Sequence, residues 1–199
     1  MFEIAAGTGI LTTLASFGGD NGAASDASLV VDAAGNLYGT TTAGGVFGDG
    51  SVFEIAAGSN TITTLVSFDG GNGVEPDAGL TADAAGNLYG TTSEGGAFGD
   101  GTVFEIAAGT HALTTLASFN DANGAIPTAS LIIDGDGNLY GTAEEGDAHD
   151  DGTLFEIVAA PTPSPRWRRS ISATARRPIA ADRGRSRKSV RHGEHGRRR

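Results

Sequence analysis

Basic residues are missing from most of this 199-residue chain, and their absence limits what the protein can bind. All 13 Lys and Arg residues lie at or after Arg166, whereas residues 1–165 contain 22 Asp and Glu residues. The first 165 residues therefore carry a charge of about −22, and the remainder carries about +11. So negative a surface repels nucleic acid and anionic membranes, and it favours cations and basic partners.

Cysteine and long apolar runs are also absent. Without cysteine the chain can form neither disulfides nor thiolate metal sites. No run approaches the roughly 18 apolar residues of a membrane span. We do not expect residues 1–9 to act as a signal peptide, because they contain no basic residue and no long apolar stretch. The first copy of a repeated word lacks its usual preceding residues, so we expect a fragment of a longer array.

What the chain does contain is a repeat with a constant step of 51 residues. The words FEI, LYGT and TTL each return at this step. They begin at Phe2, Phe53, Phe104 and Phe155, at Leu37, Leu88 and Leu139, and at Thr12, Thr63 and Thr114. A fixed period of this length is typical of a tandem-repeat architecture. We therefore predict a repeat domain over residues 1–158.

One full period, residues 77–127, predicts four short β-strands. The candidate runs are rich in β-branched and aromatic residues or end at turn residues, and none has a helical period. They cover residues 79–83, 87–92, 102–107 and 112–119. The connectors are too short for a helix, so neighbouring strands should be antiparallel. In the first connector Gly86 can take a positive φ, and Asp83 can bond the backbone two residues on.

Each predicted sheet has apolar residues on both faces, so one copy cannot cover itself. In the third strand Phe104 and Ile106 point one way and Val103 the other. Copies should therefore stack face to face. The fold we predict is all-β: a propeller-like array of four-stranded antiparallel repeats, incomplete because it holds three periods and one extra strand. The alternative is a β-solenoid, whose coils are usually shorter and whose strands pair between repeats.

The repeated pattern D-x-x-GNLYGT…GG…G-[ST]-VFEI…TTL-x-SF…NG closely resembles the GloVer tandem repeat, over roughly residues 1–158. The resemblance implies exported, surface-associated proteins with no established activity. We therefore expect an extracellular or cell-surface location. A glycan or another surface protein is the partner that such a location would offer.

The composition changes abruptly after the repeats. Residues 159–165 are Pro-rich and read as an extended linker. Residues 166–199 contain 12 Arg and one Lys, and we expect them to be disordered. Three interpretations remain open for this tail: a frame-shifted translation, plain disorder held to the acidic repeats by charge, or a nucleic-acid-binding arm. We expect no nucleic-acid binding by the repeats themselves.

One turn has partial resemblance to a calcium loop. Asp134, Asp136 and Asn138 place oxygen ligands at alternate positions, and Glu145 falls at the twelfth position. However, Leu139 occupies the sixth position, which such a loop reserves for glycine. We therefore favour a turn with an Asp–backbone bond, and we assign no metal ligand and no cofactor.

Aromatic residues in Gly-rich loops are the other candidate for binding. Phe47 and Phe98 occupy equivalent places in two loops, and His149 lies in the third. Such rings could stack against sugars, but a ring that plugs the gap between adjacent sheets is the commoner arrangement.

Recurring acids do not form a recognisable catalytic set. Glu3, Glu54, Glu105 and Glu156 repeat in the FEI strand, where a solvated strand face explains them better than a cation ladder. No His repeats beside them, and His111 and His149 are isolated. We therefore assign no catalytic residue and predict a non-enzymatic scaffold for binding or display. The alternatives are a carbohydrate-active hydrolase or lyase on the same scaffold, and nucleic-acid binding through the tail.

Overall fold

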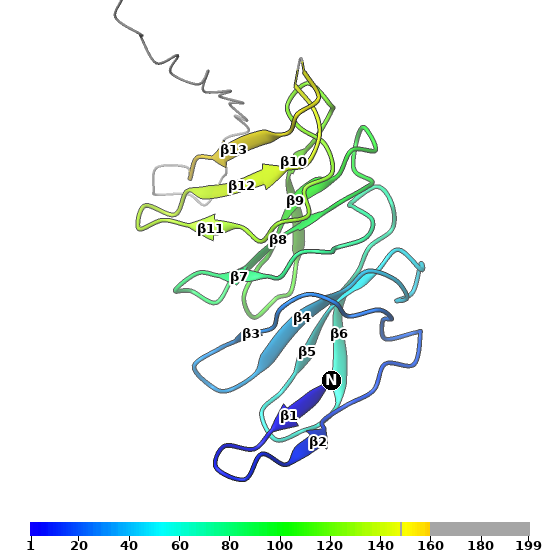
Figure 1. Ribbon diagram of the computed structural model, residues 1–199, viewed down its shortest axis with the longest axis vertical. Coiled ribbons are helices and arrows are strands. Elements are labelled where there is room, and N and C mark those ends of the chain that lie inside the picture. The colour runs from blue at the N-terminus through cyan, green and yellow to red at the C-terminus, as the bar shows by residue number, and fades with distance from the viewer. Residues whose placement is uncertain (148, 160–199) are drawn as a thin grey trace, which may run out of the picture.

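The computed structural model describes residues 1–147 and 149–159, and within these ranges every regular element is a β-strand. The strands form four separate antiparallel sheets, which follow one another along the long axis of the molecule (Figure 1). The all-β prediction is therefore confirmed. The described ranges contain no helix that could cross a membrane. The linker expected at 159–165 and the tail expected at 166–199 lie outside the described residues, apart from Ala159.

The sheets are numbered here in chain order. Sheet 1 contains β1 (Phe2–Ile4) and β2 (Leu11–Thr13). Sheet 2 contains β3 (Val30–Val31), β4 (Leu37–Thr41), β5 (Ser51–Ile55) and β6 (Ile62–Ser67). Sheet 3 contains β7 (Thr81–Ala82), β8 (Leu88–Thr92), β9 (Thr102–Ile106) and β10 (Leu113–Ser118). Sheet 4 contains β11 (Ile132–Ile133), β12 (Leu139–Ala143) and β13 (Thr153–Ile157).

Sheet 3 shows how one repeat folds as a meander, with each strand beside the next. The predicted turn joins β7 to β8: Gly86 has φ 85°, and the Ala85 N–H donates to Asp83 Oδ1 at 2.9 Å. Strands β8 and β9 then pair without interruption along their whole length. The pairing of β9 with β10 shifts by one residue at Leu116, which forms a bulge. All four strands predicted from the sequence are present.

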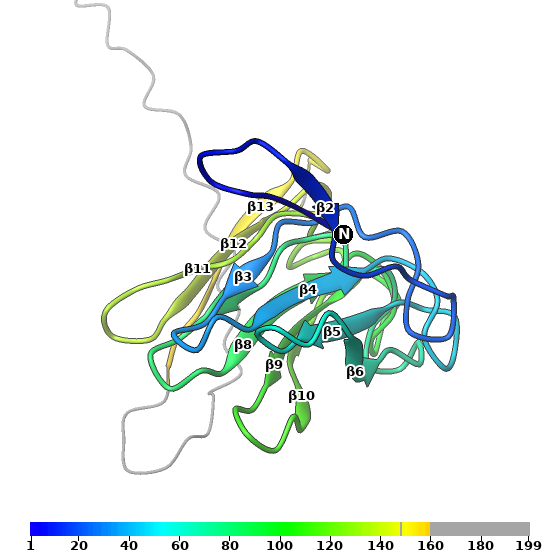
Figure 2. The ribbon, with the colours of Figure 1, turned by 90° about the horizontal axis from the view of Figure 1, so that it is seen from below.

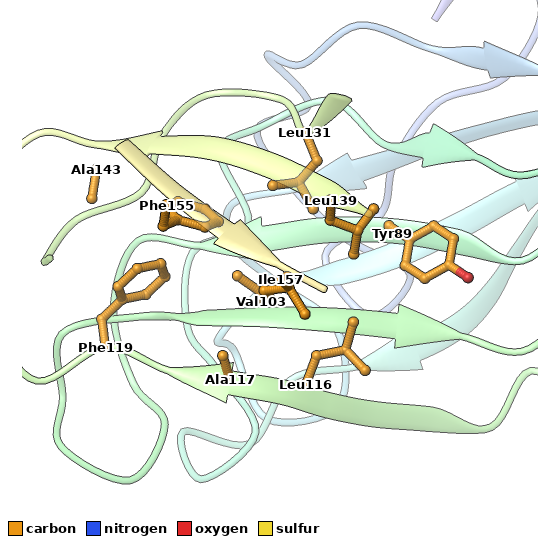
Figure 3. Close-up of a cluster of buried hydrophobic side chains, with 10 residues drawn as sticks. All are labelled: Tyr89, Val103, Leu116, Ala117, Phe119, Leu131, Leu139, Ala143, Phe155 and Ile157. Atoms are coloured by element: carbon orange, nitrogen blue, oxygen red, sulfur yellow. The ribbon is translucent and has the colours of Figure 1, made fainter. Parts of the chain in front are cut away.

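The sheets pack face to face through their apolar residues, as predicted. Phe104 and Ile106 on β9 belong to a cluster shared with sheet 2. Val103, from the other face of the same strand, belongs to a second cluster shared with sheet 4 (Figure 3). Alternate side chains of a strand point to opposite faces, so β9 contributes to the core on both sides. Figure 2, which looks along the stack, shows the sheets overlying one another.

A pair of phenylalanine rings joins each pair of neighbouring sheets. In every pair, one ring comes from the segment after a fourth strand and the other from the next FEI strand. The pairs are Phe17–Phe53, Phe68–Phe104 and Phe119–Phe155, with ring centroids 5.0, 5.2 and 5.0 Å apart. These separations suit edge-on or tilted aromatic contact. The 51-residue period in the sequence is therefore also the period of the packing.

Candidate functional site

A cluster of polar side chains recurs at the turn between the first two strands of each repeat. In the first copy Asp32 Oδ1 accepts the N–H groups of Ala34 at 2.9 Å and Asn36 at 2.8 Å. Its Oδ2 accepts Asn36 Nδ2 at 2.8 Å and the Tyr38 hydroxyl at 3.1 Å. The next two copies build the same turn on Asp83 and Asp134. Each aspartate thus uses both oxygens to hold its own turn.

The asparagine of this turn ties it to the segment that follows the third strand of the same sheet. Asn36 Oδ1 accepts the N–H of Ala57, which follows β5, at 2.9 Å. Asn87 and Asn138 make the equivalent bond, to Ala108 and Ala159. In sheets 2 and 3 this bond therefore links two turns at one end of the sheet.

Each repeat also places its tyrosine between two carboxylates. The Tyr140 hydroxyl lies 2.9 Å from Asp134 Oδ2 and 3.0 Å from Glu156 Oε1. Tyr38 has the same arrangement, at 3.1 Å from its aspartate and 3.3 Å from Glu54. A tyrosine hydroxyl carries one proton, so it donates to only one of the two carboxylates at a time. The solvated-face interpretation is wrong for Glu54, Glu105 and Glu156, which are half-buried. Glu54 and Glu156 also bond the tyrosine hydroxyl. The interpretation holds for Glu3, which is exposed.

These hydrogen bonds also move the acidities of the groups away from neutral pH. The Asn138 amide, with further donors, lowers the pKa of Asp134 to about 2. Bonds to Asp134 and Glu156 raise the pKa of Tyr140 to about 12. Burial, together with Asp32 and Glu54, raises the pKa of Tyr38 to about 12. These aspartates and tyrosines therefore keep fixed protonation states near pH 7, as suits groups that hold a fold.

The turn at Asp134 has the Asp–backbone bonds that the sequence analysis favoured over a calcium loop. Residues Leu139–Ala143 form strand β12, so Glu145 lies beyond the far end of a strand and not in a common loop with Asp134. Five strand residues span about 17 Å, too far for one ion to be shared. Asp136 is exposed on the turn. Among residues 1–147 and 149–159, no group of three or more His, Cys, Asp and Glu side chains is placed to hold a metal ion.

The Gly-rich loops between second and third strands present Phe47 and Phe98 to solvent. Their side chains are 62% and 64% exposed. The interpretation of these rings as plugs between adjacent sheets is therefore wrong, because the gap is filled by the paired phenylalanines of the core. His149 of the third loop is exposed too.

Backbone hydrogen bonds hold these two loops in one shape. In the first loop Gly44 N–H donates to Gly48 O at 3.2 Å, and Gly50 N–H donates to Gly44 O at 3.1 Å. Val46 N–H, next to the exposed ring, donates to Ser67 Oγ on β6 at 3.2 Å. The loop around Phe98 repeats all three bonds one period later. Each ring is therefore presented on a fixed support.

A small pocket of about 190 Å³ opens between sheets 2 and 3, at the end where the Asp-based turns lie. Its walls are mostly apolar or small, and its polar members are Asp32, Tyr38 and His111. The prediction that His111 is an isolated exposed residue holds, although it borders a cavity.

The sequence analysis missed both the tyrosine cluster and the pocket. Tyr38 and Glu54 are 16 positions apart and become neighbours only because β4 and β5 pair in the register that sets them opposite each other. The recurrence of LYGT and FEI at one fixed spacing was the available signal. The pocket depends on how two sheets stack, which no motif encodes.

Together, the stacked meander sheets, the recurring turns and the repeated loops define an all-β tandem-repeat protein. More specifically, the chain belongs to the Gloeobacter/Verrucomicrobia repeat family, whose model matches residues 1–167. Among curated proteins, none matches this sequence.

Proposed function

We propose that this protein is a non-enzymatic repeat scaffold, located outside the cell or at its surface, that binds a neutral glycan through Phe47 and Phe98. The observation that carries the proposal is the exposure of these two rings at equivalent places on rigid loops of consecutive repeats. Aromatic rings that ordered loops hold out in solvent offer flat apolar faces on which a ligand can stack. Another surface protein is the second class of ligand that such rings would suit.

The chemistry of the rings and the charge of the repeats favour a neutral sugar. The face of an aromatic ring is electron-rich and attracts the polarised C–H groups of a sugar. An anionic glycan would be repelled by the 22 acids of residues 1–165, which contain no Lys or Arg. Rings repeated at one period suit a ligand that is itself a repeating chain.

The absence of catalysis in this proposal rests on how the recurring acids are used. Asp32 and its two equivalents already accept bonds from the turn at both oxygens. Hydrogen bonds from Asn138 and further donors of the turn lower the pKa of Asp134 to about 2, so it is ionised at neutral pH. A general acid needs a proton near neutral pH, which Asp32 and Asp134 do not supply, because the pKa of each is lowered.

A propeller-like arrangement of the sheets is part of the proposal. Equivalent residues near the first strands, Ser28, Gly79 and Ser130, lie against one another: a Cβ on Gly79 would be 3.3 Å from Ser28 O and 3.0 Å from Ser130 Oγ. The Thr40 hydroxyl also donates to Ala78 O of the next repeat, at 3.1 Å. Sheets that converge along their first strands resemble the blades of a propeller more than the coils of a solenoid, and strands here pair within repeats.

A glycan-array screen with the full chain tests the binding proposal. We expect the wild-type protein to bind neutral glycans and the Phe47→Ala/Phe98→Ala double variant to bind them about 10-fold or more weakly. An aromatic contact is worth about 0.5–1.5 kcal/mol, so each lost ring should weaken binding by about 2- to 10-fold.

The matched control is the Val31→Ala/Ile132→Ala double variant, which removes two other exposed apolar side chains, 63% and 68% exposed. Its binding should equal that of the wild type. Equal loss in both double variants would contradict a role for the loop rings. Release of shorter sugars from a bound glycan would contradict the non-enzymatic assignment.

A further inference from the structure

The pocket between sheets 2 and 3 has the size of a single side chain. Its volume of about 190 Å³ is below the roughly 300–1,000 Å³ of pockets that hold drug-sized ligands. Val30 and Leu65 of sheet 2 face Leu88 and Ile106 of sheet 3 across it. An apolar group that entered the pocket would therefore contact aliphatic carbons of both sheets.

One position at the edge of this pocket carries a smaller residue than the equivalent positions of the neighbouring repeats. Ala82 borders the pocket, and its equivalent one period later is Ile133. Ile133 packs against the cluster shared by sheets 3 and 4, at the corresponding place between those sheets. The position one period earlier is Val31, which is also β-branched but is largely exposed. Ile133 therefore shows what the space between two complete sheets accommodates: a branched aliphatic side chain.

The equivalent tyrosines at the sheet 2–3 and sheet 3–4 interfaces also differ in their exposure. Tyr89, in the cluster that Ile133 packs against, is only 2% exposed, whereas Tyr38, which lines the pocket together with Ala82, is half-buried. The two tyrosines occupy equivalent positions on equivalent strands. The interface with the smaller residue is therefore also the one whose tyrosine is more exposed.

The electrostatic surroundings of the pocket are negative. Asp32 lies in its wall and Glu54 bonds the adjacent Tyr38. Hydrogen bonds from its turn outweigh the effect of burial and lower the pKa of Asp32, so it stays ionised. Residues 1–165 supply no Lys or Arg to balance these charges. A positively charged partner is therefore attracted to this mouth, and an acidic one is repelled.

We propose that the pocket anchors a partner protein by holding one branched aliphatic side chain (Ile, Leu or Val) that the partner presents within a basic segment. The partner's aliphatic side chain would take the place that Ile133 occupies between sheets 3 and 4. The basic residues on either side of it would lie close to the acids at the rim of the pocket. This is a second binding site, separate from the loop phenylalanines.

Short peptides test the proposal on the full chain. The peptides are acetylated and amidated KKIKK, KKAKK and EEIEE, titrated against ¹⁵N-labelled protein and followed through the amides of Gly86 and Ala108 at the pocket. We expect KKIKK to bind about fivefold or more tightly than KKAKK, because three further carbons leave water. We expect EEIEE to bind more weakly than either basic peptide. Equal binding of KKIKK and KKAKK would overturn the anchor, and equal binding of KKIKK and EEIEE would overturn the basic partner.

The Ala82→Ile variant should fill the pocket, raise the thermal midpoint and reduce the preference for KKIKK over KKAKK to less than twofold. Ala97→Ile is its control, because the equivalent position in the preceding repeat is Val46, and it should retain the preference. Ala82→Val provides a smaller filler if isoleucine prevents folding. An unchanged preference in a folded Ala82 variant would overturn the site. The Phe47→Ala/Phe98→Ala variant should keep the preference for KKIKK over KKAKK. The proposal for this site and the proposal for the glycan site can therefore be contradicted independently.

Discussion

At the scale of single residues, a glycine in the second strand of each repeat makes room for a phenylalanine in the third. Gly90 lies directly opposite Phe104 across β8 and β9. A Cβ on Gly90 would stand 2.6 Å from Phe104 Cζ and 3.1 Å from Leu80 Cδ2. Gly39 and Gly141 have the same neighbours in their repeats. The glycine of LYGT is thus required by close packing and not by a turn.

Gly90→Ala should therefore destabilise the protein by about 1–3 kcal/mol, because the added methyl group overpacks a fully buried ring. Urea unfolding of the full chain would measure the change. Gly135→Ala is the matched control: nothing lies within 4 Å of the added carbon, and its φ is not in the left-handed region. That variant should be as stable as the wild type or slightly more so. A similar loss of stability in the Gly90→Ala and Gly135→Ala variants would show that the Phe104 ring moves aside to admit the methyl group.

At the scale of elements, the strands and turns could be predicted from the sequence, but their partners across the sheet could not. The runs at 87–92 and 102–107 were visible because β-branched and aromatic residues alternate between turn signals. The bond between Tyr140 and Glu156 depends on register, which single-strand patterns do not give. The exposure of Phe98 was not predicted, because a large apolar side chain is more often buried than exposed, and the glycines around it give no sign of which way the ring points.

The tyrosine clusters predict a delayed alkaline titration. The chain has three tyrosines, and all three lie in this arrangement. The pKa of Tyr38 and of Tyr140 is raised to about 12, and that of Tyr89 is raised as well. In the folded protein the tyrosinate absorbance should therefore rise well above pH 10, whereas unfolded protein should titrate near pH 10. A folded pKa above the unfolded value contributes stability that is complete below pH 10 and is lost as the pH rises through about 12.

The Glu156→Gln variant isolates one cluster. It removes a negative charge beside the Tyr140 hydroxyl, so about one third of the tyrosinate signal should move toward pH 10. Glu3→Gln, in the same sequence word but on an exposed strand, should leave the curve unchanged. A wild-type curve that already rises at pH 10 in folded protein would contradict the hydrogen-bonded arrangement.

At the scale of the whole molecule, each sheet completes its neighbour. Phe119 of one repeat packs on Phe155 of the next, and Val103 and Phe104 of a single strand serve two different interfaces. The sequence indicated this stacking, because apolar residues on both faces of a strand must be covered. It did not indicate the pocket beside Ala82, which lies where the equivalent position one interface further on carries Ile133.

The charge distribution acts on the whole stack. The 22 acids of residues 1–165 repel one another without any Lys or Arg between them, and this repulsion opposes the compact state. The Debye length shortens from about 30 Å at 0.01 M salt to about 8 Å at 0.15 M, so added salt should screen the repulsion between sheets. We expect NaCl over this range to raise the thermal midpoint by about 2–4 °C, which corresponds to about 1 kcal/mol for a chain of this length.

Magnesium chloride at matched ionic strength separates general screening from ion binding. Equal shifts with both salts would support screening of scattered acids, whereas a larger shift with magnesium would reveal a specific cation site in the folded protein. A midpoint that falls as NaCl is added would contradict the prediction. It would mean that attraction between the repeats and the 13 basic residues at 166–199 outweighs the repulsion within the repeats, because salt weakens both. The sign of the shift therefore decides which of the two charge distributions governs the stability of the intact chain.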